Sequence, residues 1–75
     1  MQIERKALNK IIAKTMRRIQ LTHGAVRVHL QQALRLLNDG RKALSQGYER
    51  ACRTALELAH QSIQLARIVA VSDKL

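Results

Sequence analysis

The spacing of the apolar residues constrains this chain more than any other feature, because the steps alternate between four and three residues. This period is typical of α-helices that bury one side along a seam. Two mostly apolar series follow it: Ile12, Met16, Ile19, His23, Val26, Leu30, Ala33 and Leu37, and then Leu44, Tyr48, Ala51, Ala55, Leu58, Ser62, Leu65 and Val69. The sequence therefore predicts an all-α fold dominated by two long helices.

The two series are separated by Asn38, Asp39 and Gly40, a combination typical of helix C-termini and tight connections. We therefore expect helices over residues 3–37 and 41–71, folded into an antiparallel hairpin by a turn at residues 38–41. The chain has 75 residues, about half of an average domain, so residues 1–75 are expected to form a single helical domain.

Gly24 leaves an alternative open, because a glycine after Thr22 and His23 could end the first helix and produce a three-helix bundle. The phase of the apolar residues favours a continuous helix, since Leu30 stays in register with Met16 across the glycine. A glycine inside a helix costs only about 1 kcal/mol relative to alanine.

A second apolar stripe runs beside the seam of the second helix and comprises Cys52, Leu56, Ala59, Ile63 and Ala66. One hairpin cannot cover two stripes, and a chain this short is marginally stable alone. We therefore expect self-association into a homodimeric four-helix bundle. The residues expected at its interface are Ile12, Met16, Ile19, Leu30, Leu56 and Ile63.

Composition argues against several other classes of protein. The chain has no Pro and only three Gly, which disfavours turn-rich all-β folds. No phosphate-binding loop or nucleophile motif is present, so we expect no enzymatic activity and no cofactor. The three His lack helical spacing for a metal ion, and the single Cys indicates a reducing compartment, so a cytoplasmic protein is expected.

Positive charge is the most informative functional feature. The chain has fourteen Lys and Arg residues and five Asp and Glu residues, which give it a formal net charge of +9. In the first helix, cations recur every fourth residue and form a ridge: Lys6, Lys10, Lys14 and Arg18, with Arg17 beside them. This charge exceeds the ~2 to 8 that solubility requires of a small domain. We therefore expect these five residues to contact the phosphates of DNA or RNA.

Two other partners compete with nucleic acid. As a protein adaptor, subunit or chaperone, the chain would grip an acidic partner through its spare apolar stripe and residues 65–71. A membrane surface is disfavoured, because the chain has neither Trp nor Phe to anchor it. No apolar run approaches the ~20 residues of a transmembrane helix.

Overall fold

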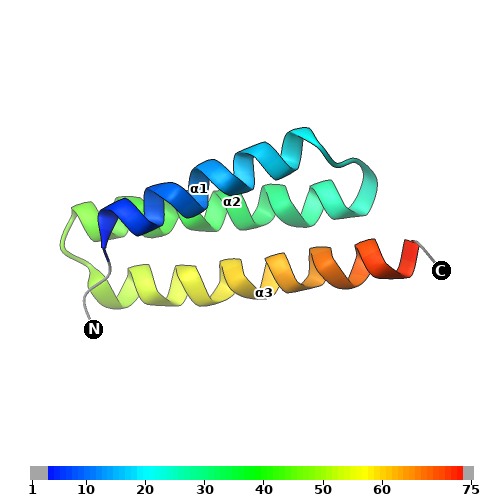
Figure 1. The fold of residues 1–75 in the computed structure, drawn as a ribbon. Helices are drawn as coiled ribbons and strands as arrows, with labels where there is room; N and C mark the ends of the chain where they lie inside the picture. The colour runs from blue at the N-terminus through cyan, green and yellow to red at the C-terminus, as the bar shows by residue number, and fades with distance from the viewer. Residues whose placement is uncertain (1–3, 74–75) are drawn as a thin grey trace.

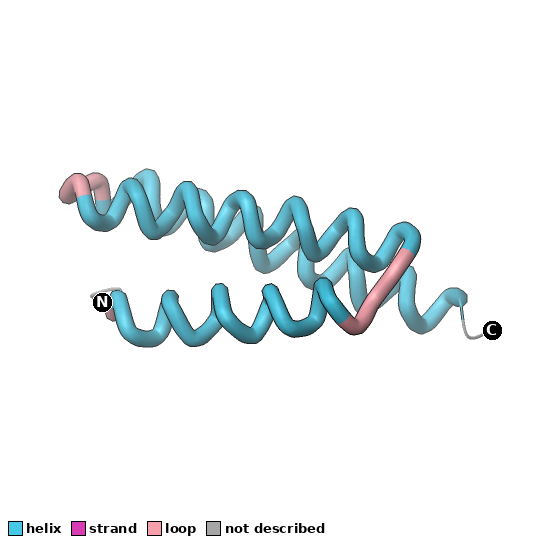
Figure 2. Tube along the Cα trace, turned by 90° about the horizontal axis from the view of Figure 1, so that it is seen from above, coloured by secondary structure: helices cyan, strands magenta, loops and turns pink. Residues whose placement is uncertain are grey.

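Three helices form an elongated bundle in the computed structural model, which describes residues 4–73 (Figure 1). They are α1 (Arg5–Gln20), α2 (Gly24–Ser45) and α3 (Glu49–Asp73). The bundle measures 43 × 19 × 17 Å. Its two connections lie at opposite ends, and α1 and α2 lie side by side with α3 behind them in the view of Figure 2. The all-helical prediction is confirmed, with three helices in place of a two-helix hairpin.

The first helix ends well before residue 37. The backbone N–H groups of Leu21 and Thr22 donate to the carbonyls of Arg18 and Ile19 at 3.1 and 3.3 Å and close the last turn of α1. Gly24 then has φ +67°, in the left-handed region that favours glycine. The expected continuous helix over residues 3–37 is therefore wrong. Each of the two helices has the four-and-three spacing because each faces the core, so a matching phase across Gly24 does not require a continuous helix.

The second connection lies at residues 46–48, and the turn expected at residues 38–41 is wrong. Gly47, with φ +84°, donates its N–H to the Leu44 carbonyl at 3.1 Å, and Tyr48 donates to the Ala43 carbonyl at 2.8 Å. These two bonds form a Schellman motif that satisfies the last carbonyls of α2. Gly40, in contrast, is buried inside α2.

Gly40 has a packing role in α2 because it lies where α3 comes closest. A Cβ atom placed on Gly40 would lie 3.4 Å from the Ala55 Cβ and 3.5 Å from the Cys52 carbonyl oxygen. The missing side chain therefore permits the approach of the two helices, and the small residues of α3 complete it.

The core lies where α1 covers one side of the α2–α3 pair. Two clusters of buried residues form it: Leu8, Ile12, Leu37, Cys52 and Ala59, and then Ile19, Leu30 and Ala66. The second apolar stripe of the last helix is thus the buried one. The seam expected there lies at the edge of the core instead. Ser62 is buried and Ala55 meets Gly40, whereas Leu58 and Leu65 are exposed by 44% and 47%.

The residues expected at a dimer interface occupy different environments. Ile12, Ile19 and Leu30 are buried within their own chain, and Leu56 and Ile63 are half-buried against the two core clusters. Met16 is 50% exposed, because Thr15 takes the inward position on α1. Most of this set is therefore already covered by the chain itself. None of the three helices, within the described residues, is long and apolar enough to cross a membrane.

Candidate nucleic-acid interface

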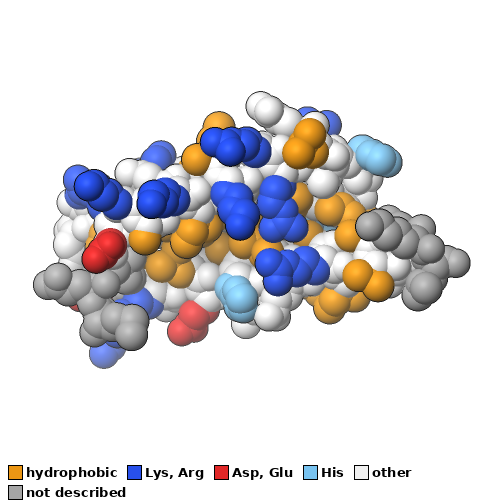
Figure 3. All heavy atoms as spheres, in the orientation of Figure 1, with side chains coloured by type: hydrophobic (Ala, Val, Ile, Leu, Met, Phe, Trp, Pro, Cys, Tyr) orange, Lys and Arg blue, Asp and Glu red, His pale blue; other side chains and the backbone are white. Residues whose placement is uncertain are grey.

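The basic ridge, defined as Lys6, Lys10, Lys14, Arg17 and Arg18, lies on the side of α1 that faces away from the core. The inward side of α1 comprises Leu8, Ile12, Thr15 and Ile19 at steps of four, three and four. At 100° per residue, the ridge falls on the remaining arc of the helix. Lys6, Lys10, Lys14 and Arg17 are exposed and Arg18 is half-buried. Figure 3 shows the cations gathered over α1 and extending toward α3.

The ridge is electrostatically uncompensated. No acidic residue occurs in the sequence of α1, and within residues 4–72 no ridge cation lies within 4.0 Å of a carboxylate. An ion pair does form on α3, where Arg53 lies 3.2 Å from Glu49. Like charges four residues apart repel, and Lys6 in the first turn opposes the helix dipole, whereas Arg17 and Arg18 in the last turn favour it. The repulsions among Lys6, Lys10, Lys14 and Arg18, which follow one another at four-residue steps, therefore cost α1 stability.

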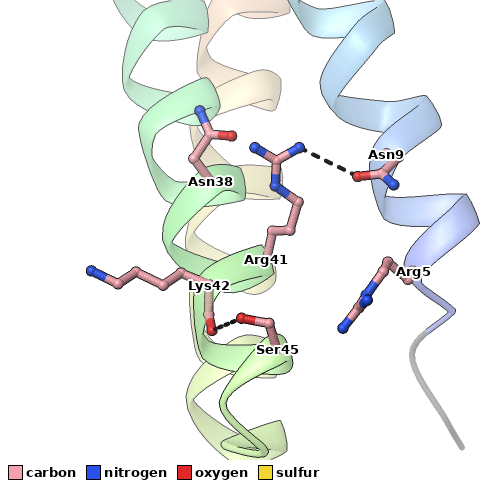
Figure 4. A pocket seen from close by; sticks show the side chains of 6 residues that line it. All are labelled: Arg5, Asn9, Asn38, Arg41, Lys42 and Ser45. Carbon is pink, nitrogen blue, oxygen red and sulfur yellow. Dashed lines mark hydrogen bonds between the residues drawn. The ribbon is translucent and has the colours of Figure 1, made fainter.

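An open basic pocket lies beside the ridge, between the start of α1 and the end of α2 (Figure 4). Its lining comprises Arg5 and Asn9 from α1 and Asn38, Arg41, Lys42 and Ser45 from α2. Arg41 Nη1 donates to Asn9 Oδ1 at 3.4 Å, and Ser45 Oγ donates to the Lys42 carbonyl at 2.7 Å. Three cations and no acid line this pocket, which suits an anion.

Sequence reasoning missed this pocket, since it placed residues 38–41 in a turn. Once residue 40 lies inside a helix, Asn38, Arg41, Lys42 and Ser45 share one side of that helix at steps of three, one and three. The spacing of these polar residues is the signal that could have shown it. Its contact with Arg5 and Asn9 depends on how α1 packs, which the local pattern does not contain.

The remaining chemical groups do not gather into a second site. His23 and His60 are exposed and His29 is half-buried, each on a different element or turn. In the part of the chain that the structure describes, no three His, Cys, Asp or Glu residues are placed to hold a metal ion. Burial, and secondarily the charge of Glu49, raises the pKa of the Cys52 thiol. A fully buried thiol of raised pKa behaves as a small apolar side chain.

Comparison with known proteins adds no relative. No family model matches the chain, and neither the curated proteins nor the solved structures searched include a significant match.

Proposed function

We propose that this protein binds the phosphate backbone of double-stranded nucleic acid through the basic ridge on α1, without enzymatic activity. The observation that carries the proposal is the uncompensated charge of the ridge, which opposes the stability of the helix that bears it. Lys6 and Arg18 lie about 18 Å apart along a straight helix, so the cations meet a backbone at regular intervals. Phosphate binding requires only positioned cations, which the ridge supplies.

The expected binding is independent of nucleotide sequence. Contacts to phosphates position a protein on a duplex but carry no sequence information by themselves. The flexible stems of the lysines accommodate the mismatch between a straight helix and a winding groove. Exposed Tyr48 is the sole aromatic residue, which disfavours binding by base stacking on single strands.

The basic pocket would extend this surface by one contact. Arg41 is oriented by its bond to Asn9, so the other N–H groups of its guanidinium remain available as donors to a phosphate oxygen. Arg5 and Lys42 add positive charge at the same place. We therefore expect Arg41→Gln to lower the affinity for duplex DNA and to flatten the slope of log K against log salt by about one.

The test compares two triple variants of equal net charge. Lys10, Lys14 and Arg17 are replaced by Gln in the first variant, and the exposed Arg27, Arg35 and Arg50 are replaced by Gln in the control. Affinity for duplex DNA and duplex RNA is measured by fluorescence anisotropy over a series of salt concentrations. For duplex DNA, the first variant should flatten the slope of log K against log salt by roughly three. The control should change the slope by less than about one.

Two results would contradict the proposal. The first is that the unaltered protein does not bind duplexes at low salt. The second is that both triple variants lose the same affinity and salt dependence, because an equal loss would show that binding depends only on the net charge of the protein. A protein adaptor is the second candidate in that case. It is favoured by Ile68 and Val71 on α3, each 62% exposed, which would contact an acidic partner together with nearby cations.

A further inference from the structure

Both α2 and α3 carry mostly apolar residues at strict seven-residue spacing on the side turned away from α1. This set, here named the α2–α3 face, comprises His29, Leu36 and Ala43 on α2 and Ala51, Leu58 and Leu65 on α3. Seven-residue spacing is typical of helices that pack against further helices. The phosphate-binding proposal uses none of these residues.

The contact at Gly40 shows where this face lies. Gly40 of α2 contacts Ala55 of α3. When two antiparallel helices touch at one residue each, the residues four positions before and three positions after the contact lie on the same side of the helix pair in both helices. These residues are Leu36 and Ala43 on α2, and Ala51 and Leu58 on α3. The opposite offsets give Leu37 and Leu44, and Cys52 and Ala59, which form or adjoin the core cluster that contains Leu8 and Ile12 of α1. Leu36 and Ala43 are half-buried and also border this cluster, so they form the inner edge of the face. The α2–α3 face therefore points away from α1 (Figures 1 and 2).

The same register arranges the face in three layers. Because α2 and α3 are antiparallel, Ala43 lies level with Ala51, Leu36 with Leu58, and His29 with Leu65, at intervals of roughly 10 Å. The layer nearest the turn at residues 46–48 has only small side chains, and the far layer has only large ones. Leu58 and Leu65 are almost half exposed, at 44% and 47%. The face is thus mostly apolar, with His29 as its polar residue, and it is incompletely covered and tapered.

We propose that a second copy of this chain covers the α2–α3 face and forms a homodimer. The exposed area supports a partner, because one chain exposes 5824 Å². That is about 1,200 Å² more than a compact monomer of 8.5 kDa exposes by the usual scaling of surface with mass. The elongated shape of 43 × 19 × 17 Å contributes to this surplus, and a standard interface covers ~800 Å² on each partner.

The distribution of charge selects a second copy as the occupant. Two molecules of net charge +9 repel unless they meet where cations are absent. The six residues of the α2–α3 face include no Lys or Arg, and the positions one step further outward are Gln32, Asp39, Thr54, Gln61 and Ile68, with exposed Arg50 at the edge beside Ala51. An acidic partner would therefore find no cation among the six residues of the face. A second copy can cover the face without bringing Lys or Arg side chains together there.

The taper indicates that the two copies run in opposite directions, with their turns at residues 46–48 at opposite ends of the dimer. In this orientation the small layer of one copy meets the large layer of the other, so the volume between them is filled evenly. Leu58 then lies near the two-fold axis and faces Leu58 of the second copy, and Ala51 faces Leu65. The parallel orientation would leave a void at one end and crowd the other.

The dimer would place the two basic ridges on opposite outer sides, because α1 covers the other side of each α2–α3 pair. If the ridge binds duplexes as proposed above, the dimer can hold two duplexes at once. This consequence depends on the proposed function, whereas the dimer itself does not.

Sedimentation equilibrium of the full chain tests the dimer without nucleic acid. The unaltered protein should be dimeric at micromolar concentration, and Leu58→Glu should weaken association at least ~10-fold, since each dimer would bury two unpaired carboxylates. Met16→Glu is the matched control, because Met16 is 50% exposed on α1, and it should remain dimeric. Circular dichroism verifies that each variant is helical. A monomeric unaltered protein, or a Leu58→Glu variant that dimerises as before, would overturn the proposal.

Disulfide formation tests the face and orientation with a substitution that introduces no charge. Leu58→Cys should link two copies under mild oxidation, whereas the unaltered protein should not, because Cys52 is fully buried. A mixture of Ala51→Cys and Leu65→Cys should give mainly the mixed dimer. Failure of Leu58→Cys to link would contradict the antiparallel arrangement.

A bridging assay separates failure of the dimer from failure of the phosphate-binding proposal. Surface-bound duplex DNA should capture a second, labelled duplex in the presence of the unaltered protein. Leu58→Glu should still bind one duplex and lose the capture of the second. Loss of single-duplex binding in the Lys10, Lys14 and Arg17 variant would test the phosphate-binding proposal and would leave the dimer untouched. A monomeric protein that still bridges would count against the dimer.

Discussion

The three glycines of this chain have three different structural roles at the residue scale. Gly24 and Gly47 have φ +67° and +84°, and no atom lies within 4 Å of a Cβ added to either. We therefore expect Gly24→Ala and Gly47→Ala each to lower the free energy of unfolding by about 1–2 kcal/mol, through backbone strain alone. Urea denaturation followed by circular dichroism measures the change.

Gly40→Ala is the comparison for those two variants. Alanine gains roughly 1 kcal/mol of helix propensity there, but its Cβ meets Ala55 at 3.4 Å, so the net change should stay within about 1 kcal/mol. A stabilising Gly24→Ala would show instead that α1 and α2 form one continuous helix.

At the element scale, the inward side of α1 can be tested at two adjacent residues. Thr15 is 4% exposed, and its hydroxyl donates to the Ile11 carbonyl at 2.8 Å, whereas Met16 is 50% exposed. Thr15→Val keeps the shape and removes only a bond made within the helix, so we expect a change from zero to about 1 kcal/mol of added stability. Thr15→Asp should destabilise by several kcal/mol. Met16→Asp should lower the free energy of unfolding by less than ~1 kcal/mol. A larger loss for Met16→Asp than for Thr15→Asp would show that Met16, and not Thr15, faces the core.

The elements also show what the sequence can and cannot reveal. The helical period, the inward positions of Ile12, Ile19 and Leu30, and the outward placement of the lysines all follow from spacing along a helix. The break at Gly24 does not, since the same glycine suits a cap or a helix interior, and tertiary packing decides between them. Gly40 illustrates the reverse, because the proximity of Ala55 explains a glycine that resembles a turn signal.

The choice between the two stripes of α3 is also decided by packing. Both stripes have helical spacing, and both include large apolar residues. The structure buries Cys52, Ala59 and Ala66 of one stripe and Ser62 of the other, because small side chains permit the close approach of α2, and it leaves Leu58 and Leu65 partly exposed. The basic pocket could not be predicted for a related reason, since Arg5 and Arg41 line one pocket only because α1 packs on α2.

For the whole molecule, removing cations from the ridge should lower the affinity for duplexes and raise the thermal stability of the protein. Replacing only Lys10 and Lys14 by Gln removes their repulsions with each other, with Lys6 and with Arg18, each worth a few tenths of a kcal/mol, and keeps Arg17, which favours the helix dipole in the last turn. We therefore expect this variant to unfold at a higher temperature than the unaltered protein at low salt, while it binds duplexes less well. The difference should shrink as salt rises, because salt screens exposed charges. Calorimetric unfolding at several salt concentrations measures the difference. A Lys10 and Lys14 double variant that is less stable than the unaltered protein at low salt would show that the charge of the ridge supports the fold of α1.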